Sequence, residues 1–247
     1  MLTTILDRRP ARSIDDVVAM MTAIDRALPD ADGVKWFNRL YLRVTQAVDA
    51  ALEQATFHDP EFLRRLDVVF ANLYFDAAAA GDVDPASAPA AWRPLFCARN
   101  VTGIHRLQFA LAGMNAHINR DLPAAIVRLC TQVGGRPSRG DSRHADFELV
   151  NNLLELVEAQ VKTEFTTGII GVIDAAAGQL DDIAAMWNVR KARDLAWTNS
   201  EVMWQLRAVP ALGADFFSRL DSFTGCAGRG LLVRVTPLRS VGGAHSF

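Results

Sequence analysis

The stretch GMNAHINRDLP, residues 113–123, gathers side chains that can hydrogen-bond or transfer protons, and most of it belongs to a predicted helix at about 101–121. His117 and Asp121 are four residues apart, so a helix places them on the same side. A carboxylate in this position can accept one imidazole N–H, fix the tautomer and increase the basicity of the other ring nitrogen. The pair therefore predicts a general acid–base, with His117 as the reacting group and Asp121 as its orienting partner.

Two other interpretations of this pair remain open. His117 and Asp121 could bind a single divalent cation together with a carboxylate from another helix. Alternatively, both residues are structural, with His117 a core histidine and Asp121 an acceptor of loop N–H groups. No further cofactor is predicted.

Two carboxylates lie in a segment that is apolar on all sides, EFLRRLDVVFANLYFDAAAAG at residues 61–81. Removing a carboxylate from water is costly unless it is paired or bound. Asp67 and Asp76 therefore need partners, and at most one of them is expected at the site of His117. The structural alternative for each is an ion pair with an arginine: Arg39, Arg43 or Arg106.

Polar residues also interrupt apolar stripes elsewhere, and we interpret them as candidate ligands for substrate oxygens. Asn151 and Glu158 fall inside the stripe of a predicted helix at about 146–165, and four such helices favour a polar-lined pocket inside a bundle. The predicted substrate-binding residues are Gln108, Asn115, Asn119, Asn151, Glu158 and Tyr74.

A predicted helix at about 188–209 carries aromatic and ionisable residues on one strip. Trp187, Trp197 and Trp204 belong to it, interleaved with charged side chains. Such a strip can line a pocket or form a partner surface, so a homodimer through these tryptophans is one expectation. The alternative is a second contact with the core.

Composition limits the class of protein. The chain has 247 residues, 50% of them hydrophobic, and a net charge of −2. Because no long basic run or 20-residue apolar stretch occurs, neither nucleic acid nor a membrane is expected as a partner. The segment MLTTILDRRPARS is charged where a signal peptide is apolar, and Cys97, Cys130 and Cys226 follow no disulfide pattern, so a cytoplasmic protein is expected.

Helical periodicity predicts an all-α fold: a single-domain bundle of about seven to nine helices with an internal polar-lined pocket. The helical domain is expected at residues 1–224. Residues 225–247 are expected to form an irregular tail, with LLVRV at 231–235 as the one plausible strand. Phosphate-binding glycine motifs, HExxH, ExxH pairs and GxSxG are not present in the sequence.

Several segments together resemble a bacterial domain-of-unknown-function family marked by a G-M-N-A-H-I-N-x-D-L-P motif. They are FNRLYLRVTQAV, DPEFLRRLDVVFANLYFDA, the AW pair at 91–92, DFELVNNLL and the motif itself, within about residues 33–220. The resemblance implies an all-helical intracellular protein. The His-x-x-x-Asp spacing is also similar to that of zinc phospholipases C, but five histidines and a Met1-Leu2 start do not match their trinuclear zinc centre.

These observations favour an intracellular enzyme acting on a small molecule by His/Asp acid–base chemistry. Cyclisation, isomerisation and hydrolysis are all compatible, because each needs a positioned proton transfer. One alternative is an enzyme that uses a mononuclear divalent metal at the same residues. The other is a non-catalytic ligand-binding or scaffolding protein.

Overall fold

The structure is a computed structural model that describes residues 2–54, 57–166 and 188–234, without the side chains of 156 and 158–166. Every regular element within these ranges is helical, which confirms the predicted all-α class. The elements in chain order are α1 (Leu2–Leu6), α2 (Ile14–Ala27), α3 (Gly33–Gln54), α4 (Pro60–Val83), η1 (Pro85–Ser87), α5 (Arg93–Ala98), α6 (Arg106–Ala116), η2 (His117–Asp121), α7 (Leu122–Val133), α8 (Ser142–Thr166), α10 (Val189–Leu206) and α11 (Pro210–Leu231).

The helix starts follow local chemistry that is readable in the sequence. The Ser13 hydroxyl accepts the backbone N–H of Asp16, whose carboxylate accepts the N–H of Ser13, which makes a capping box at the start of α2. At α4 the Asp59 side chain accepts the N–H of Phe62, and Pro60 occupies the first turn.

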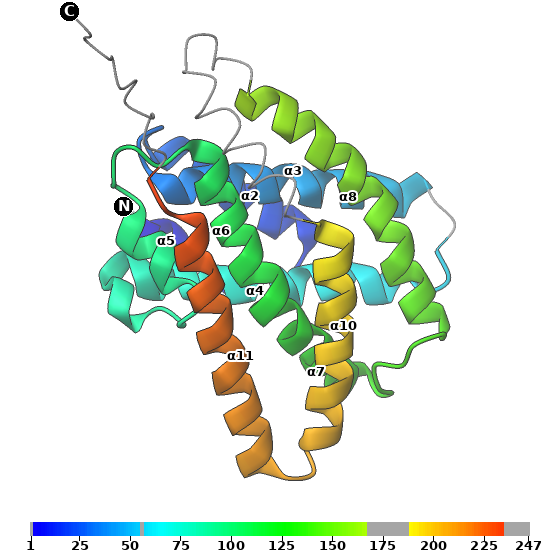
Figure 1. Cartoon of the computed structure of the whole chain (residues 1–247). Coiled ribbons are helices and arrows are strands. Elements are labelled where there is room, and N and C mark those ends of the chain that lie inside the picture. The colour runs from blue at the N-terminus through cyan, green and yellow to red at the C-terminus, as the bar shows by residue number, and fades with distance from the viewer. Residues whose placement is uncertain (1, 55–56, 167–187, 235–247) are drawn as a thin grey trace, which may run out of the picture.

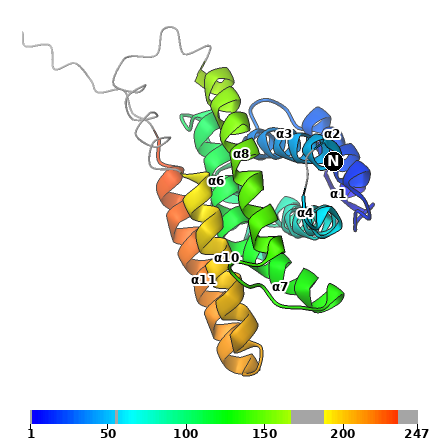
Figure 2. The ribbon, with the colours of Figure 1, turned by 90° about the vertical axis from the view of Figure 1, so that its right-hand side faces the viewer.

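The helices α6, η2 and α7 run end to end through the middle of the molecule (Figure 1). The helices α3 and α4 lie on one side of this central rod, whereas α10 and α11 form an antiparallel pair on the other (Figure 2). Because α8 packs against α3, α4 and α10, it helps to enclose the middle of the rod between the two sides.

The close approach of α3 to α6 depends on a glycine within the motif. A Cβ atom added at Gly113 would overlap the ring of Phe37, so this position needs a residue without a side chain. Phe37 is fully buried and contacts the rings of Tyr74 and Trp92 edge-on. The glycine thus allows an aromatic core to form directly beside the polar motif.

Two predicted boundaries were wrong. The segment predicted as one helix over 101–121 begins at Arg106, and its last five residues form the π-helical turn η2. The predicted tail was placed too early, because α11 continues to Leu231. Residues 232–234 form no strand, and the remainder of the tail from 235 lies outside the described residues.

No helix in the described part of the chain is long and apolar enough to cross a membrane.

Candidate functional site

The motif places His117 and Asp121 together in a widened helical turn. In η2 the Leu122 N–H donates to the carbonyl of His117, five residues earlier, instead of four as in an α-helix. The His117 Nδ1 and Asp121 Oδ2 atoms are 3.0 Å apart, and both side chains are buried. The predicted pair is therefore formed, and it faces the interior. Turns of this type are frequent at functional sites.

Asp121 is a fully buried carboxylate that is surrounded by N–H donors. Its Oδ2 accepts the indole N–H of Trp92 at 2.9 Å as well as the imidazole, and its Oδ1 accepts a guanidinium N–H of Arg120. Arg120 also donates to Asp221 of α11 at 3.0 Å. These bonds replace the water that the carboxylate lost and hold its orientation.

The hydrogen bonds define the state of the His117 ring. Since Asp121 Oδ2 is an acceptor, Nδ1 carries the proton and Nε2 presents a lone pair, an assignment that rests on the hydrogen-bond pattern. Burial lowers the pKa of His117 below its ordinary range, against the opposing effect of Asp121. The ring is thus neutral at physiological pH. Its Nε2 atom is buried and has no hydrogen-bond partner within the described residues.

Aromatic rings hold the imidazole in place. Phe70 stacks on it, with ring centroids 3.5 Å apart and planes at 5°. Tyr41 meets it edge-on at 4.5 Å, and Trp92 lies at 5.9 Å. This packing explains the loss of solvent around His117 and restricts the ring to one orientation.

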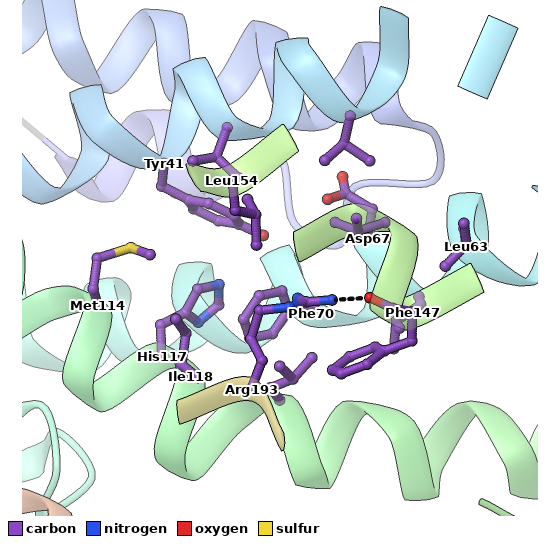
Figure 3. A pocket seen from close by; sticks show the side chains of 15 residues that line it. Tyr41, Leu63, Asp67, Phe70, Met114, His117, Ile118, Phe147, Leu154 and Arg193 are labelled. Carbon is purple, nitrogen blue, oxygen red and sulfur yellow. Dashed lines mark hydrogen bonds between the residues drawn. The ribbon is translucent and has the colours of Figure 1, made fainter. Parts of the chain in front are cut away.

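His117 lies in the wall of a small pocket between α3, α4, α6, η2, α7, α8 and α10 (Figure 3). The pocket has a volume of about 60 Å³, room for roughly four water molecules. Most of its lining is hydrocarbon from leucine, valine, isoleucine, methionine and phenylalanine side chains. The pocket is therefore less polar than the sequence suggested. The polar side chains in its wall are Tyr41, Asp67, His117 and Arg193.

Asp67 is the second carboxylate of the pocket. Its Oδ2 atom is buried and has no hydrogen-bond partner within the described residues. Burial, and secondarily the negative charge of Asp49, raises the pKa of Asp67 to about 7. The group can therefore hold a proton near neutral pH. In Figure 3 Asp67 lies across the pocket from His117, whereas the Tyr41 ring reaches from α3 to the imidazole.

The Tyr41 hydroxyl and the Arg193 guanidinium complete the polar part of the wall. Tyr41 is buried, and its hydroxyl oxygen has no hydrogen-bond partner among the described residues. Burial, together with the charge of Asp67, raises its pKa, so the phenol remains protonated. Arg193 reaches the pocket from α10 and bonds to Asn151 and to the carbonyl of Phe147.

A single family model covers all residues of the site. The model of the family of unknown function DUF5995 matches residues 14–234, which include η2, the pocket and Arg193. The chain belongs to the DUF5995 family. This membership confirms the resemblance to a domain-of-unknown-function family. No curated protein and no solved structure matches the chain.

The other candidate carboxylate of this DUF5995 chain, Asp76, lies outside the pocket. It lies on the solvent side of α4 and pairs with Arg9 at 3.2 Å, so it cannot act in the pocket. The sequence suggested burial because the helix is apolar on all sides. Asp76 is exposed because its side chain points away from the aromatic core. Its partner is none of the three arginines that we considered.

Three predicted substrate ligands have structural roles on the far side of α6. Gln108 closes the capping box of α6 and donates to the carbonyls of Leu231 and Val233. Asn115 donates to the carbonyl of Thr224, and Asn119 donates to Asn115. Their hydrogen-bonding capacity serves the contact with α11 and the preceding turn, and none of them lines the pocket.

The remaining predicted ligands lie behind the pocket or have side chains outside the described residues. Asn151 is buried and accepts from Arg193 at 2.6 Å, so it positions a pocket residue instead of lining the pocket. The Tyr74 hydroxyl donates to Asn38 at 3.2 Å inside the core. The side chain of Glu158 lies outside the described residues.

Trp197, the middle residue of the tryptophan strip, is not accessible to a second copy of the chain. Trp197 is fully buried and packs against Phe147 and His144, so it belongs to the core contact that we considered as the alternative. Trp204 is half-buried, and Trp187 lies outside the described residues.

The Asp121 carboxylate is not free to bind a metal ion together with His117. A cation on Asp121 would have to displace the N–H donors of Trp92, Arg120 and His117, one of which carries a positive charge. Across the described ranges, no group of three His, Cys, Asp or Glu side chains is arranged to hold a metal ion.

Sequence reasoning missed Trp92, Tyr41 and Arg193. Trp92 follows a proline-rich connector, and only the fold brings its indole N–H to Asp121. Tyr41 sits on a regular apolar stripe, where a tyrosine is indistinguishable from a core aromatic. Arg193 had a weak signal. Of the two arginines in VRKARDLAW, it is the one that lies four residues after Val189 and four before Trp197, on the buried face of the helix.

Proposed function

We propose that this chain is an enzyme that transfers protons on a small, mainly apolar molecule, with His117 as the general base. The observation that carries the proposal is the His117 Nε2 atom, a buried acceptor in the wall of a pocket that has no partner among the described residues. An unpaired buried acceptor destabilises the fold by roughly 1–3 kcal/mol, so its presence calls for a role. Accepting a substrate proton is the simplest one.

The surrounding residues support a division of roles. Asp121 keeps the proton on Nδ1 and stabilises the imidazolium that forms when Nε2 accepts a proton. Asp67, protonated near neutral pH, is suited to donate a proton from the opposite wall. Tyr41 can donate a hydrogen bond to an oxygen on which negative charge develops. Two groups with opposite proton states favour isomerisation or cyclisation, in which one proton leaves and another is delivered.

We further propose that the protein works in the cytoplasm. Cys97, Cys130 and Cys226 are all free thiols, as expected for a reducing compartment.

The test compares metabolite extracts incubated with the wild-type protein and with two variants, His117→Gln and Asp121→Asn. Untargeted mass spectrometry should reveal a substrate–product pair that the wild type converts and that His117→Gln leaves unchanged. Asp121→Asn should retain a small fraction of the rate, because the wrong tautomer is then favoured.

Circular dichroism must show that both variants are folded. Conversion at the wild-type rate by folded His117→Gln would contradict the proposal. The same conclusion would follow if a folded wild type and folded variants gave identical metabolite profiles across extracts of the native host.

A further inference from the structure

Arg193 carries a positive charge in the interior of the protein. Its Nε donates to Asn151 Oδ1 at 2.6 Å, its Nη2 donates to the Phe147 carbonyl at 2.9 Å, and its guanidinium lies 3.9 Å from the centre of the Phe147 ring. The residue is 7% exposed. All of these partners are neutral, and within the described residues no carboxylate pairs with Arg193.

A buried guanidinium that forms no ion pair is unusual, because removing a charge from water costs several kcal/mol unless it is paired. Burial lowers the pKa of Arg193 to about 9, with a partly compensating effect of Glu148. The side chain is therefore still protonated at neutral pH. Its neutral partners fix the direction of the guanidinium but do not balance its charge.

The same side chain lines the pocket that contains His117. In Figure 3 the guanidinium lies between His117 and Phe147, facing the space that Tyr41 and Asp67 face from the other wall. The remaining lining is hydrocarbon. A molecule that fits this wall needs a compact anionic group at one end and an apolar body.

We propose that the pocket binds a small organic carboxylate, with Arg193 holding the carboxylate and the apolar side chains covering the carbon chain. This inference rests on the proposed function, because it names the substrate class of the same site. A planar guanidinium matches a carboxylate with parallel hydrogen bonds. The volume of about 60 Å³ limits the carbon chain to a few atoms in the absence of expansion.

The experiment uses propanoate as the probe, with its neutral isostere propanamide and with chloride as comparisons. Titration of the full chain followed by two-dimensional ¹H–¹⁵N NMR, including the arginine Nε–H signals, gives a Kd for each. We expect propanoate to bind at least tenfold more tightly than propanamide, because only the carboxylate pairs with the guanidinium. It should bind more tightly than chloride, because its methyl and methylene groups enter the apolar lining.

Matched variants assign the binding to Arg193. Arg193→Gln should weaken propanoate binding at least tenfold and leave propanamide binding unchanged. Arg190→Gln removes an exposed arginine one turn earlier on α10 that pairs with Glu155 of α8, and should have no effect. If Arg193→Gln does not fold, Arg193→Lys, which keeps the charge but loses the planar fork, should bind more weakly than the wild type.

Equal affinities for propanoate and propanamide in the wild type would overturn the inference without the use of any variant. An unchanged propanoate Kd in folded Arg193→Gln would do the same, and equal affinities for propanoate and chloride would indicate an adventitious anion site only. His117→Gln separates the two proposals, since it should still bind propanoate. Propanoate binding without turnover of any metabolite would remove the enzyme proposal and leave the carboxylate site standing.

Discussion

The imidazole of His117 lies parallel to the phenyl ring of Phe70, with the centroids 3.5 Å apart. We predict that Phe70→Leu will lower kcat by about 10- to 100-fold, with a smaller effect on KM, for the reaction that metabolite profiling reveals. Without the stacked ring, the His117 imidazole is no longer held in line with the substrate proton. Steady-state kinetics measures this change. The ¹⁵N signals of the imidazole should broaden in the same variant.

The matched control is Phe75→Leu on the same helix, where the ring is fully buried but packs against Tyr74. It should cost a similar amount of stability and leave kcat and the imidazole signals near their wild-type values. An equal loss of kcat in both variants would mean that the stacking on His117 has no special role.

Asp67→Asn should change the pH dependence of stability in a defined direction. The pKa of Asp67 is raised to about 7 in the folded protein from an ordinary value of 3.8. The folded state therefore binds its proton more tightly, and the stability that this provides below about pH 4 is lost as the pH rises to about 7. Asn at this position stays uncharged, so the variant does not lose this stability as the pH rises.

We therefore expect the Tm of Asp67→Asn relative to the wild type to increase from pH 4 to pH 8 and to level off above pH 8. In a chain of this size, 1 kcal/mol corresponds to roughly 2–4 °C. Thermal denaturation followed by circular dichroism measures it. Asp76→Asn, on the solvent side of α4, should show no comparable trend, and a pH-independent difference for Asp67→Asn would contradict the assignment.

Asp221 connects α11 to the motif and to the connector before α5. Its oxygens accept the backbone N–H groups of Ala90 and Ala91 and the Nε of Arg120. Asp221→Asn removes the charge and one acceptor oxygen, so we expect a loss of about 1.5–3 kcal/mol in the free energy of unfolding. Urea denaturation measures it.

The control for this substitution is Asp215→Asn in the same helix, which breaks an exposed pair with Arg219. It should cost much less, because both side chains of this pair are exposed to solvent. Comparable losses in the two variants would show that the Asp221 bonds contribute no more than a surface pair.

Substitution by alanine should change the free energy of unfolding differently at two glycines of α11. A Cβ atom at Gly225 would overlap the carbonyl oxygen of Ala90, whereas one at Gly230 has open space around it. Gly225→Ala should therefore lower the free energy of unfolding by about 1–3 kcal/mol. Gly230→Ala should be neutral or raise it by up to about 1 kcal/mol, since alanine favours a helix. The measurement is again urea denaturation, and a stabilising Gly225→Ala would contradict the tight contact between α11 and Ala90.

The parts of the site that depend on local spacing could be predicted from the sequence. His117 and Asp121 come together because they are four residues apart in a helical segment, and Asp67 was recognised as a carboxylate that needs an explanation. The long periodic helices were predicted for the same reason: burial of an apolar stripe is a local property of the sequence.

The parts that depend on which helix faces which could not be predicted. Asp67 and Asp76 have similar apolar neighbours in the sequence, yet one lines the pocket and the other is exposed. Asn115 looked like a substrate ligand because nothing in the sequence shows that the Thr224 carbonyl, 109 residues later, needs a donor. The position of Arg193 at the pocket depends on its bonds to neutral partners on another helix, which the sequence does not show.

The widened turn at 117–121 ties the site to the packing of the whole rod. Each residue added to a helix rotates everything after it by about 100°. Loss of one residue from η2 would restore a regular helix but turn Leu122, Ile126 and Leu129 of α7 out of the core in which they are buried. The widened turn is therefore required for the packing of α7 as well as for the position of His117, so a deletion within it should disrupt the fold more than a substitution of either side chain of the pair.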